Sequence, residues 1–412
     1  MKSDVNALKF VIVGHVDHGK STLIGRLFFD TDSLSADKME EVKAASKDLG
    51  RQTEFAFLLD HLREEREQGI TIDTAQTFFK TKKREYVIID APGHREFVKN
   101  MITGASQAEA AVLIIDVDQG VQEQTRRHAY ILAMLGLEQV IVILNKMDLV
   151  GFSKDKFEQV RTEAEKFLQS INIKAKFYIP VSAIKGDNVA KRSKNMKWYD
   201  GLTVLESLDA LQNRVSAENK APVMPVQDIY KIGEKRIIAG RIEAGVIKKG
   251  QKVKILPSGE DTEVKSIEKF LQKTDKSVAG ESTGITTSTP AFLERGNIIC
   301  AGDGQPTLTD SFRANIFWMA RENFDKEQKI TLRCATQEIS CKIEKIVKRM
   351  DSSTLEVIEE DAATLKPLEV GEVLIKTKRA VAIKRFNDLE ELGRFVLVKN
   401  ENTCAGGIIT EV

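Results

Sequence analysis

The chain has 412 residues, enough for about two to four domains, and its 42% hydrophobic and 30% charged residues are ordinary for a globular protein. A formal net charge of +1 argues against a general attraction to nucleic acid, although a local basic patch is compatible with it. The four cysteines form no CxxC pair, so we expect buried reduced thiols and not a metal site. The absence of an 18-residue apolar run and of an apolar leader predicts a cytoplasmic location.

Short apolar runs alternate with helical patterns over the first half of the chain. The predicted buried strands are 8–14, 85–93, 110–117, 140–148 and 177–183, and the predicted helices are 21–30, 95–109 and 122–136. Strands that are apolar on both faces and separated by helices predict a mostly parallel sheet with helices on both faces.

The helical pattern fades after a linker at 217–222. The rest of the chain consists of short β-branched segments separated by Gly, Pro and Asp, which predict two all-β barrel domains. The expected domains are therefore 1–216, 217–308 and 309–412.

The first chemical motif is GHVDHGKS, residues 14–21, which lies between a predicted strand and a predicted helix. That context is the one a phosphate-binding loop requires, because glycines let backbone N–H groups point inward at the start of a helix. Lys20 can place its charge on the β and γ phosphates, and the Ser21 hydroxyl can bind Mg²⁺. His15 and His18 are expected to shape this loop and not to react.

The second motif is DAPGH, residues 90–94, at the end of the next strand. Asp90 can hold the Mg²⁺ shell through water, and Gly93 can donate its backbone N–H to the γ-phosphate. His94 could orient the attacking water. Thr71, in the loop before this strand, could bind Mg²⁺ only in the GTP state, which would make it a switch.

The third motif is NKMD, residues 145–148, and a fourth segment, VSAIK, follows at 181–185. Asp148 can accept hydrogen bonds from N1 and N2 of guanine, a donor pair that adenine lacks. Asn145 can tie the base loop to the phosphate loop, the stem of Lys146 can cover the base, and the Ala183 N–H can approach the guanine O6. The four motifs in this order predict an α/β P-loop GTPase domain.

These segments resemble the translation-factor GTPases, especially elongation factor 1-alpha. The resemblance covers the whole chain and implies that Val16 forms an apolar gate beside His94 with Ile70, and that Asp17 helps to seat a monovalent cation. The expected catalytic residues are His94, Lys20 and Gly93, and the expected Mg²⁺ ligands are Ser21, Thr71 and Asp90. The expected GTP-binding residues are Gly14, His15, Val16, Asp17, His18, Gly19, Lys20, Ser21, Thr22, Asn145, Lys146, Asp148, Ser182, Ala183 and Ile184. His61 and His128 are expected at the surface or partly packed.

The first helix, the segment 121–150 and parts of both barrels resemble more closely the GTPase subunit of bacterial sulfate adenylyltransferase. This resemblance implies GTP hydrolysis coupled to synthesis of adenosine 5'-phosphosulfate from ATP and sulfate on a small adenylyltransferase subunit as partner. His15, Ala91 and the pair Asp17 and His18 depart from that subunit's pattern. The alternatives are a translation factor that delivers aminoacyl-tRNA or acts with a release factor, and a GTP-dependent switch with another partner.

Overall fold

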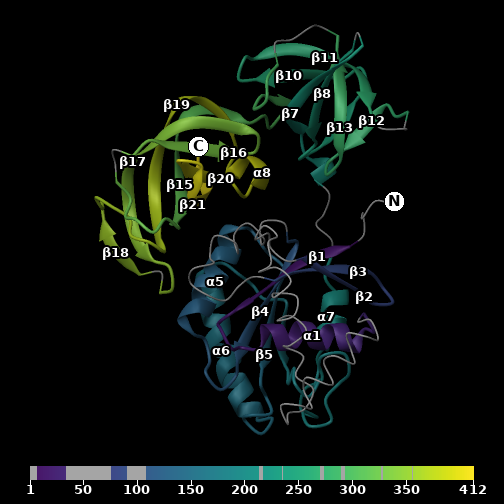
Figure 1. Ribbon diagram of the computed structural model, residues 1–412, viewed down its shortest axis with the longest axis vertical. Helices are drawn as coiled ribbons and strands as arrows, with labels where there is room; N and C mark the ends of the chain where they lie inside the picture. Colours follow the sequence, from purple (N-terminus) through teal and green to yellow (C-terminus); the bar gives the residue numbers. More distant parts are fainter. Residues whose placement is uncertain are drawn as a thin grey trace, which may run out of the picture. The chain divides into compact units, whose positions relative to one another are not determined.

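The computed structural model describes residues 7–33, 76–90, 108–212, 217–233, 235–269, 273–288, 293–325, 328–354 and 356–412. The chain divides into two compact units, Met1–Arg214 and Val215–Val412 (Figure 1). Both barrels lie in the second unit. The domain boundaries expected after residues 216 and 308 stay predictions.

The first unit is built on a six-stranded sheet with the order β2-β3-β1-β4-β5-β6. All neighbouring strands are parallel except β2, which runs antiparallel to β3. The strands are β1 (Leu8–Gly14), β2 (Gln76–Lys80), β3 (Glu85–Asp90), β4 (Ala110–Asp116), β5 (Val140–Asn145) and β6 (Phe177–Pro180). The sequence pattern missed β2, because it is a mostly exposed strand at the sheet edge.

Helices cover both faces of this sheet (Figure 1), which confirms the predicted fold class. They are α1 (Lys20–Asp30), α5 (Glu123–Met134), α6 (Lys154–Ser170) and α7 (Val204–Asp209). Helices α1 and α7 share one apolar cluster with β1, in which Leu23, Leu27 and Leu208 are buried together with Phe10. Helix α6 begins where Ser153 accepts a hydrogen bond from the Lys156 N–H. Most of the predicted helix 95–109 falls outside the described residues.

The second unit begins with the 3₁₀ helix η2 (Ala217–Asn219) and contains two barrels. The first is closed in the order β10-β11-β13-β8-β7-β14. Its strands are β7 (Val223–Ile232), β8 (Lys235–Arg241), β10 (Lys252–Leu256), β11 (Glu260–Glu268), β13 (Ser282–Thr287) and β14 (Ile298–Cys300), and a small ribbon pairs β9 (Val246–Lys248) with β12 (Lys276–Val278).

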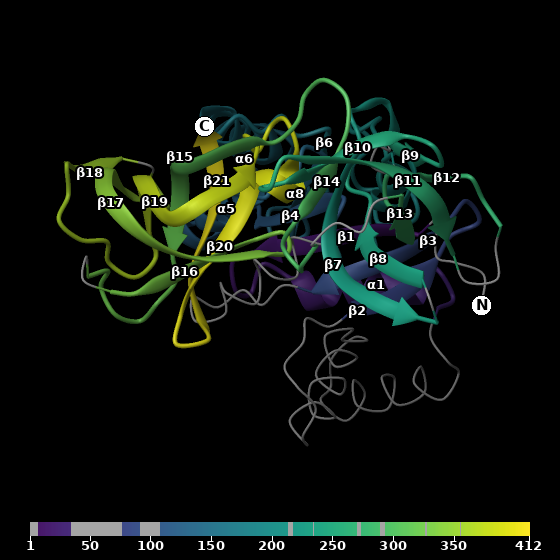
Figure 2. The same ribbon diagram turned by 90° about the horizontal axis from the view of Figure 1, so that it is seen from above.

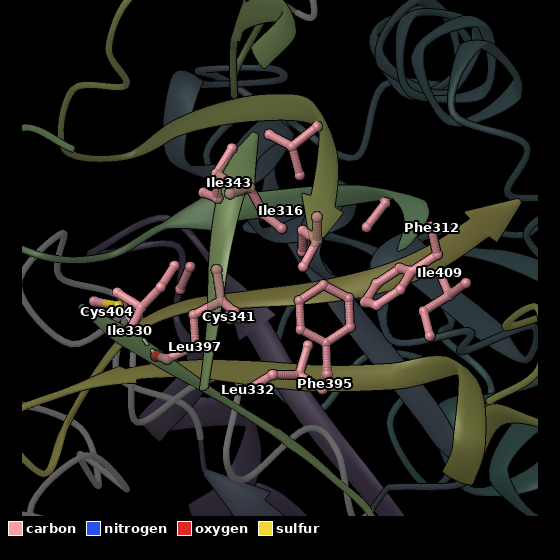
Figure 3. Close-up of a cluster of buried hydrophobic side chains, with 14 of the residues drawn as sticks. Phe312, Ile316, Ile330, Leu332, Cys341, Ile343, Phe395, Leu397, Cys404 and Ile409 are labelled. Carbon is pink, nitrogen blue, oxygen red and sulfur yellow. Dashed lines mark hydrogen bonds between the residues drawn. The ribbon is translucent and has the colours of Figure 1, made fainter. Parts of the chain in front are cut away.

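The second barrel follows the order β16-β20-β21-β15-β19-β17 and closes because β16 also pairs with β17, while β18 extends from the outer edge of β17 (Figure 2). Its elements are β15 (Thr307–Trp318), β16 (Ile330–Cys334), β17 (Gln337–Asp351), β18 (Val357–Glu360), β19 (Glu369–Ile383), β20 (Arg394–Lys399), β21 (Asn402–Glu411) and the short helix α8 (Glu390–Gly393). Its core is lined by aliphatic, aromatic and cysteine side chains (Figure 3). All four cysteines are buried thiols that form no disulfide, as expected.

A separate apolar cluster joins the two barrels. Val223, Leu256 and Ile298 of the first barrel contact Leu389 and Leu392, which precede and belong to α8 of the second. Burial of such side chains stabilises the pair, by about 1.5–3 kcal/mol for each fully buried one. None of the helices in the described part of the chain is both long and apolar enough to cross a membrane.

We predict that Ile316→Ala destabilises the second unit by about 2–5 kcal/mol, because Ile316 is fully buried in the core of the second barrel. Val357→Ala on β18 is the matched control, since Val357 is 48% exposed and its truncation should change stability by less than about 0.5 kcal/mol. Urea unfolding of both variants tests this. Equal losses would contradict the assignment of Ile316 to the core.

Candidate guanine-nucleotide site

The candidate site lies at the carboxyl ends of the parallel strands of the first unit. The loop after β1, the end of β3 at Asp90 and the end of β5 at Asn145 are brought to one edge, because Ile12 pairs with Asp90, and Asp116 with Asn145. Ligands of open α/β sheets bind at this edge. The parallel topology therefore gathers three motifs that are far apart in the sequence.

The loop between β1 and α1 needs glycine at both ends. Gly14 has a φ of 155°, and a Cβ there would lie 2.4 Å from the Ile114 carbonyl oxygen. Gly19 has a φ of 92°, and its Cβ would lie 2.4 Å from the Asn145 Nδ2. Only a residue without a side chain lets the backbone pass this closely.

Lys20 is held in place by the loop that precedes it. Its Nζ donates hydrogen bonds to the carbonyl oxygens of Gly14 at 2.9 Å and His15 at 2.8 Å. Helix α1 starts here after Gly19, which offers no side-chain cap to the first N–H groups. These N–H groups and the ammonium form a cradle that suits a phosphate. Val16, Asp17, Ser21 and Thr22 lie along the same turn and the first turn of α1.

Asn145 joins the phosphate loop to the loop after β6. Its Nδ2 donates to the His18 carbonyl oxygen at 2.9 Å, and its Oδ1 accepts from the Ala183 N–H at 3.0 Å. The side chain is 2% exposed, so both bonds are shielded from water. The Ala183 N–H, expected to approach the guanine O6, thus donates to Asn145 in the structure.

Asp148 is oriented by a neighbouring hydroxyl. Ser182, which is fully buried, donates its Oγ–H to the Asp148 Oδ1 at 2.6 Å. This short, charge-assisted bond fixes the carboxylate plane before a base arrives. Ile184 is 44% exposed, two residues beyond Ser182.

Lys146 makes an ion pair that the sequence motifs do not reveal. Its Nζ lies 2.9 Å from the Oδ2 of Asp116, whose side chain is 2% exposed. The backbone of Lys146 is left-handed, with a φ of 64°. Asp116 ends the apolar strand β4, beside Asn145 at the end of β5. The available signal is a carboxylate that ends an otherwise apolar strand, the predicted strand directly before the one that leads into the NKMD motif.

Two histidines, His15 and His18, belong to the phosphate loop, and a third, His128 of α5, lies close to it. The rings of His15 and His18 are 5.1 Å apart, and the His18 Nδ1 lies 3.3 Å from the Ile114 carbonyl oxygen. Burial lowers the pKa of His18 to about 4, and burial followed by the charge of Lys20 lowers the pKa of His128 to about 3. The expectation that His128 lies at the surface or is partly packed is wrong, because α5 buries it against the loop at 1% exposure. His61 lies outside the described residues.

The donor set around the cradle fits GTP with Mg²⁺. Ser21 and Asp90 supply the oxygen donors that Mg²⁺ prefers, from the start of α1 and the end of β3. Among the residues that the structure describes, no three His, Cys, Asp or Glu side chains form a metal cluster of their own. Thr71, Gly93 and His94 lie outside the described residues, so their roles stay predictions.

We predict that Gly14→Ala weakens GTP binding roughly a hundredfold or more, because the new Cβ meets the Ile114 backbone oxygen at 2.4 Å and displaces the loop. Gly151→Ala is the control: its φ of 60° is also left-handed, but nothing lies within 4 Å of its Cβ. Titration with a fluorescent guanine nucleotide measures both. Normal affinity in the Gly14 variant would remove the loop from the site.

We predict that the nucleotide-free protein loses stability as the pH falls from about 6.5 towards 4. An unfolded histidine takes up a proton near pH 6.5, whereas the pKa values of His18 and His128 in the folded chain are about 4 and about 3. The loss is about 1.4 kcal/mol per pH unit for each neutral histidine. Urea unfolding between pH 7 and 5 should show a smaller loss for His128→Gln, which cannot titrate, than for the parent. Parallel curves would refute this.

Comparisons with known proteins cover the whole chain. The family "Elongation factor Tu GTP binding domain" matches residues 5–217, "Elongation factor Tu domain 2" matches 235–300 and "GTP-eEF1A C-terminal domain-like" matches 311–410. Elongation factor 1-alpha of Methanosphaerula palustris is 36% identical over 100% of this chain and 98% of its own length. That of Thermoplasma acidophilum is 38% identical over 99% and 98%. A structure of sup35 complexed with GDP is 25% identical over 99% of this chain and 94% of its own, with a TM-score of 0.46.

The full-length relatives overturn one prediction. The expected GTPase subunit of sulfate adenylyltransferase, with its small adenylyltransferase partner and its coupling to phosphosulfate synthesis, is wrong, because relatives at 36–38% identity over nearly their entire length are elongation factors 1-alpha. Three family matches in chain order agree with the three expected domain types. The chain belongs to the elongation factor Tu/elongation factor 1-alpha family of three-domain GTPases, which bind GTP with Mg²⁺.

Proposed function

We propose that this chain is a translation factor that binds aminoacyl-tRNA in its GTP state and releases it after GTP hydrolysis. The observation that carries the proposal is the match to elongation factors 1-alpha over all three domains, barrels included. A GTP-binding domain alone would leave the partner open, since that fold serves many functions. Both barrel regions also match family models of elongation factors, over residues 235–300 and 311–410. We also propose that the protein works in the cytoplasm.

The nucleotide site supports a guanine-specific switch. The Asp148 carboxylate, held by Ser182, would accept the guanine N1 and N2 hydrogens, and Lys20 would neutralise the β and γ phosphates. Mg²⁺, when bound, supplies charge neutralisation at the phosphates, with Ser21 and Asp90 as the described residues that would hold it. We assign Thr71 and Gly93 to sensing the γ-phosphate, and His94 to orienting the attacking water.

A near-neutral chain can still bind RNA. The net charge of +1 describes the whole sequence of 62 basic and 61 acidic residues, and those charges need not be evenly spread. Binding of aminoacyl-tRNA would therefore depend on a local basic surface and on the nucleotide state more than on attraction by the net charge of the chain. This distinction makes the nucleotide dependence the decisive measurement.

We predict that the GTP-bound protein protects aminoacyl-tRNA from spontaneous deacylation at least about tenfold better than the GDP-bound protein, within the usual range of coupling between two sites. The measurement is the hydrolysis rate of the aminoacyl ester against protein concentration, with deacylated tRNA as competitor.

Asp148→Asn is the matched control for this experiment. Xanthine presents an acceptor where guanine presents a donor, so the variant should protect aminoacyl-tRNA with xanthosine triphosphate and not with GTP. The proposal would be overturned if aminoacyl-tRNA were protected equally by the GTP-bound and the GDP-bound protein. It would also be overturned if protein shown to hold GTP gave no protection. A failure of Asp148→Asn to change nucleotide preference would overturn only the base-pocket assignment.

A further inference from the structure

The carboxylate of Asp116 has one partner on each oxygen. Oδ1 accepts a hydrogen bond from the Asp118 N–H at 2.9 Å, and Oδ2 lies 2.9 Å from the Lys146 Nζ. The side chain is 2% exposed, whereas that of Lys146 is 28% exposed. The anion is thus fixed by the backbone after β4 and holds a cation that still reaches the surface of the site.

This ion pair spans two strands that end side by side. Asp116 is the last residue of β4 and pairs in register with Asn145, the last residue of β5, directly before Lys146. The left-handed backbone of Lys146, with a φ of 64°, turns the chain sharply at this point. Since four rotatable bonds separate the ammonium of a lysine from its backbone, a fixed anion at the far end removes most of that freedom.

The same carboxylate also acts on the phosphate side of the site. It lies close enough to His18 for its charge to raise the pKa of that ring, against the larger effect of burial. Asn145, its register neighbour, donates to the His18 carbonyl oxygen. Asp116 is therefore connected to both loops. Among the described residues, Lys146 is the only cation that forms an ion pair with it.

We infer that Asp116 is a positioning residue of the guanine pocket: it anchors the ammonium of Lys146 so that the aliphatic stem of this lysine lies preformed along the face of the base. Because the stem is already ordered in the free protein, binding of the nucleotide costs less conformational entropy, and the affinity for the nucleotide is higher. The inference deepens the proposed function and rests on the assignment of Lys146 to the base pocket.

The experiment measures GTP, GDP and ITP affinities by competition with a fluorescent guanine nucleotide. Asp116→Asn keeps an oxygen acceptor for the Asp118 N–H and removes the charge that holds Lys146. It should weaken all three nucleotides by a similar factor, about tenfold, because the stem covers the ring plane and not the 2-amino group. At saturating GTP, kcat of intrinsic hydrolysis should stay unchanged while KM rises.

A double-mutant cycle with Lys146→Met separates positioning from a general structural effect. If Asp116 acts through Lys146, adding Asp116→Asn to Lys146→Met should cause no further loss of affinity, whereas independent effects would multiply. Thermal unfolding without nucleotide checks the fold of each variant. If Asp116→Asn does not fold, Asp116→Glu takes its place, because it keeps the charge but displaces the carboxylate, and it should also raise all three dissociation constants.

Two results would overturn the inference. One is a normal nucleotide affinity in Asp116→Asn while Lys146→Met binds weakly, which leaves the base pocket intact and removes Asp116 from it. The other is a double-mutant cycle in which the two losses of affinity multiply, or a changed ratio of the GTP and ITP dissociation constants. Either would place the effect of Asp116→Asn elsewhere, such as at Asp148. Normal affinity in Lys146→Met, which keeps an unbranched apolar stem but has no ammonium for Asp116 to anchor, would overturn the inference as well.

Discussion

The side-chain amide of Asn145 holds the nucleotide site together. It bonds both to the phosphate loop, through the His18 carbonyl oxygen, and to the loop after β6, through the Ala183 N–H. Its burial makes each of these bonds costly to leave unmade, at about 1–3 kcal/mol for a buried unpaired group. It also restricts position 19 to glycine, because a Cβ there would lie 2.4 Å from the Asn145 Nδ2.

This bridge couples the two halves of the nucleotide. The loop that would hold the phosphates and the loop that would hold the base cannot shift independently while Asn145 bonds to both. Binding energy gained at the base is therefore available to order the phosphate loop, and a disturbance of either loop reaches the other. A switch protein needs such a connection between recognition of the base and the state of the phosphates.

Much of this site could be predicted from the sequence, because parallel strands bring the residues after their carboxyl ends together whatever the loop lengths. Gly14, Lys20, Asn145 and Asp148 were found in this way. The structure added what depends on packing across elements. His128 follows a helical pattern that does not say which face meets the phosphate loop, and the Asp116–Lys146 pair requires the register of β4 and β5.

The mistaken assignment to sulfate adenylyltransferase has a physical explanation. It relied on short segments of α1, of 121–150 and of the barrels, where apolar spacing and turn residues are set by the fold that both groups share. Similarity in such short segments reflects the packing of the shared fold more than the identity of the binding partner. Similarity sustained over nearly the full length distinguishes the groups, and here it favours elongation factor 1-alpha.

The apolar cluster between the barrels has a consequence for how the chain can be recombined. Val223, Leu256 and Ile298 come from one barrel, and Leu389 and Leu392 from beside and within α8 of the other, so the two barrels share an apolar interface that is separate from their own cores. A chimaera that exchanges one barrel with that of a relative would mismatch this seam and leave voids or clashes that neither parent has. The barrels are therefore exchanged most easily as a pair, and a crossover should be better tolerated at the linker before Val223 than at the junction near residue 308.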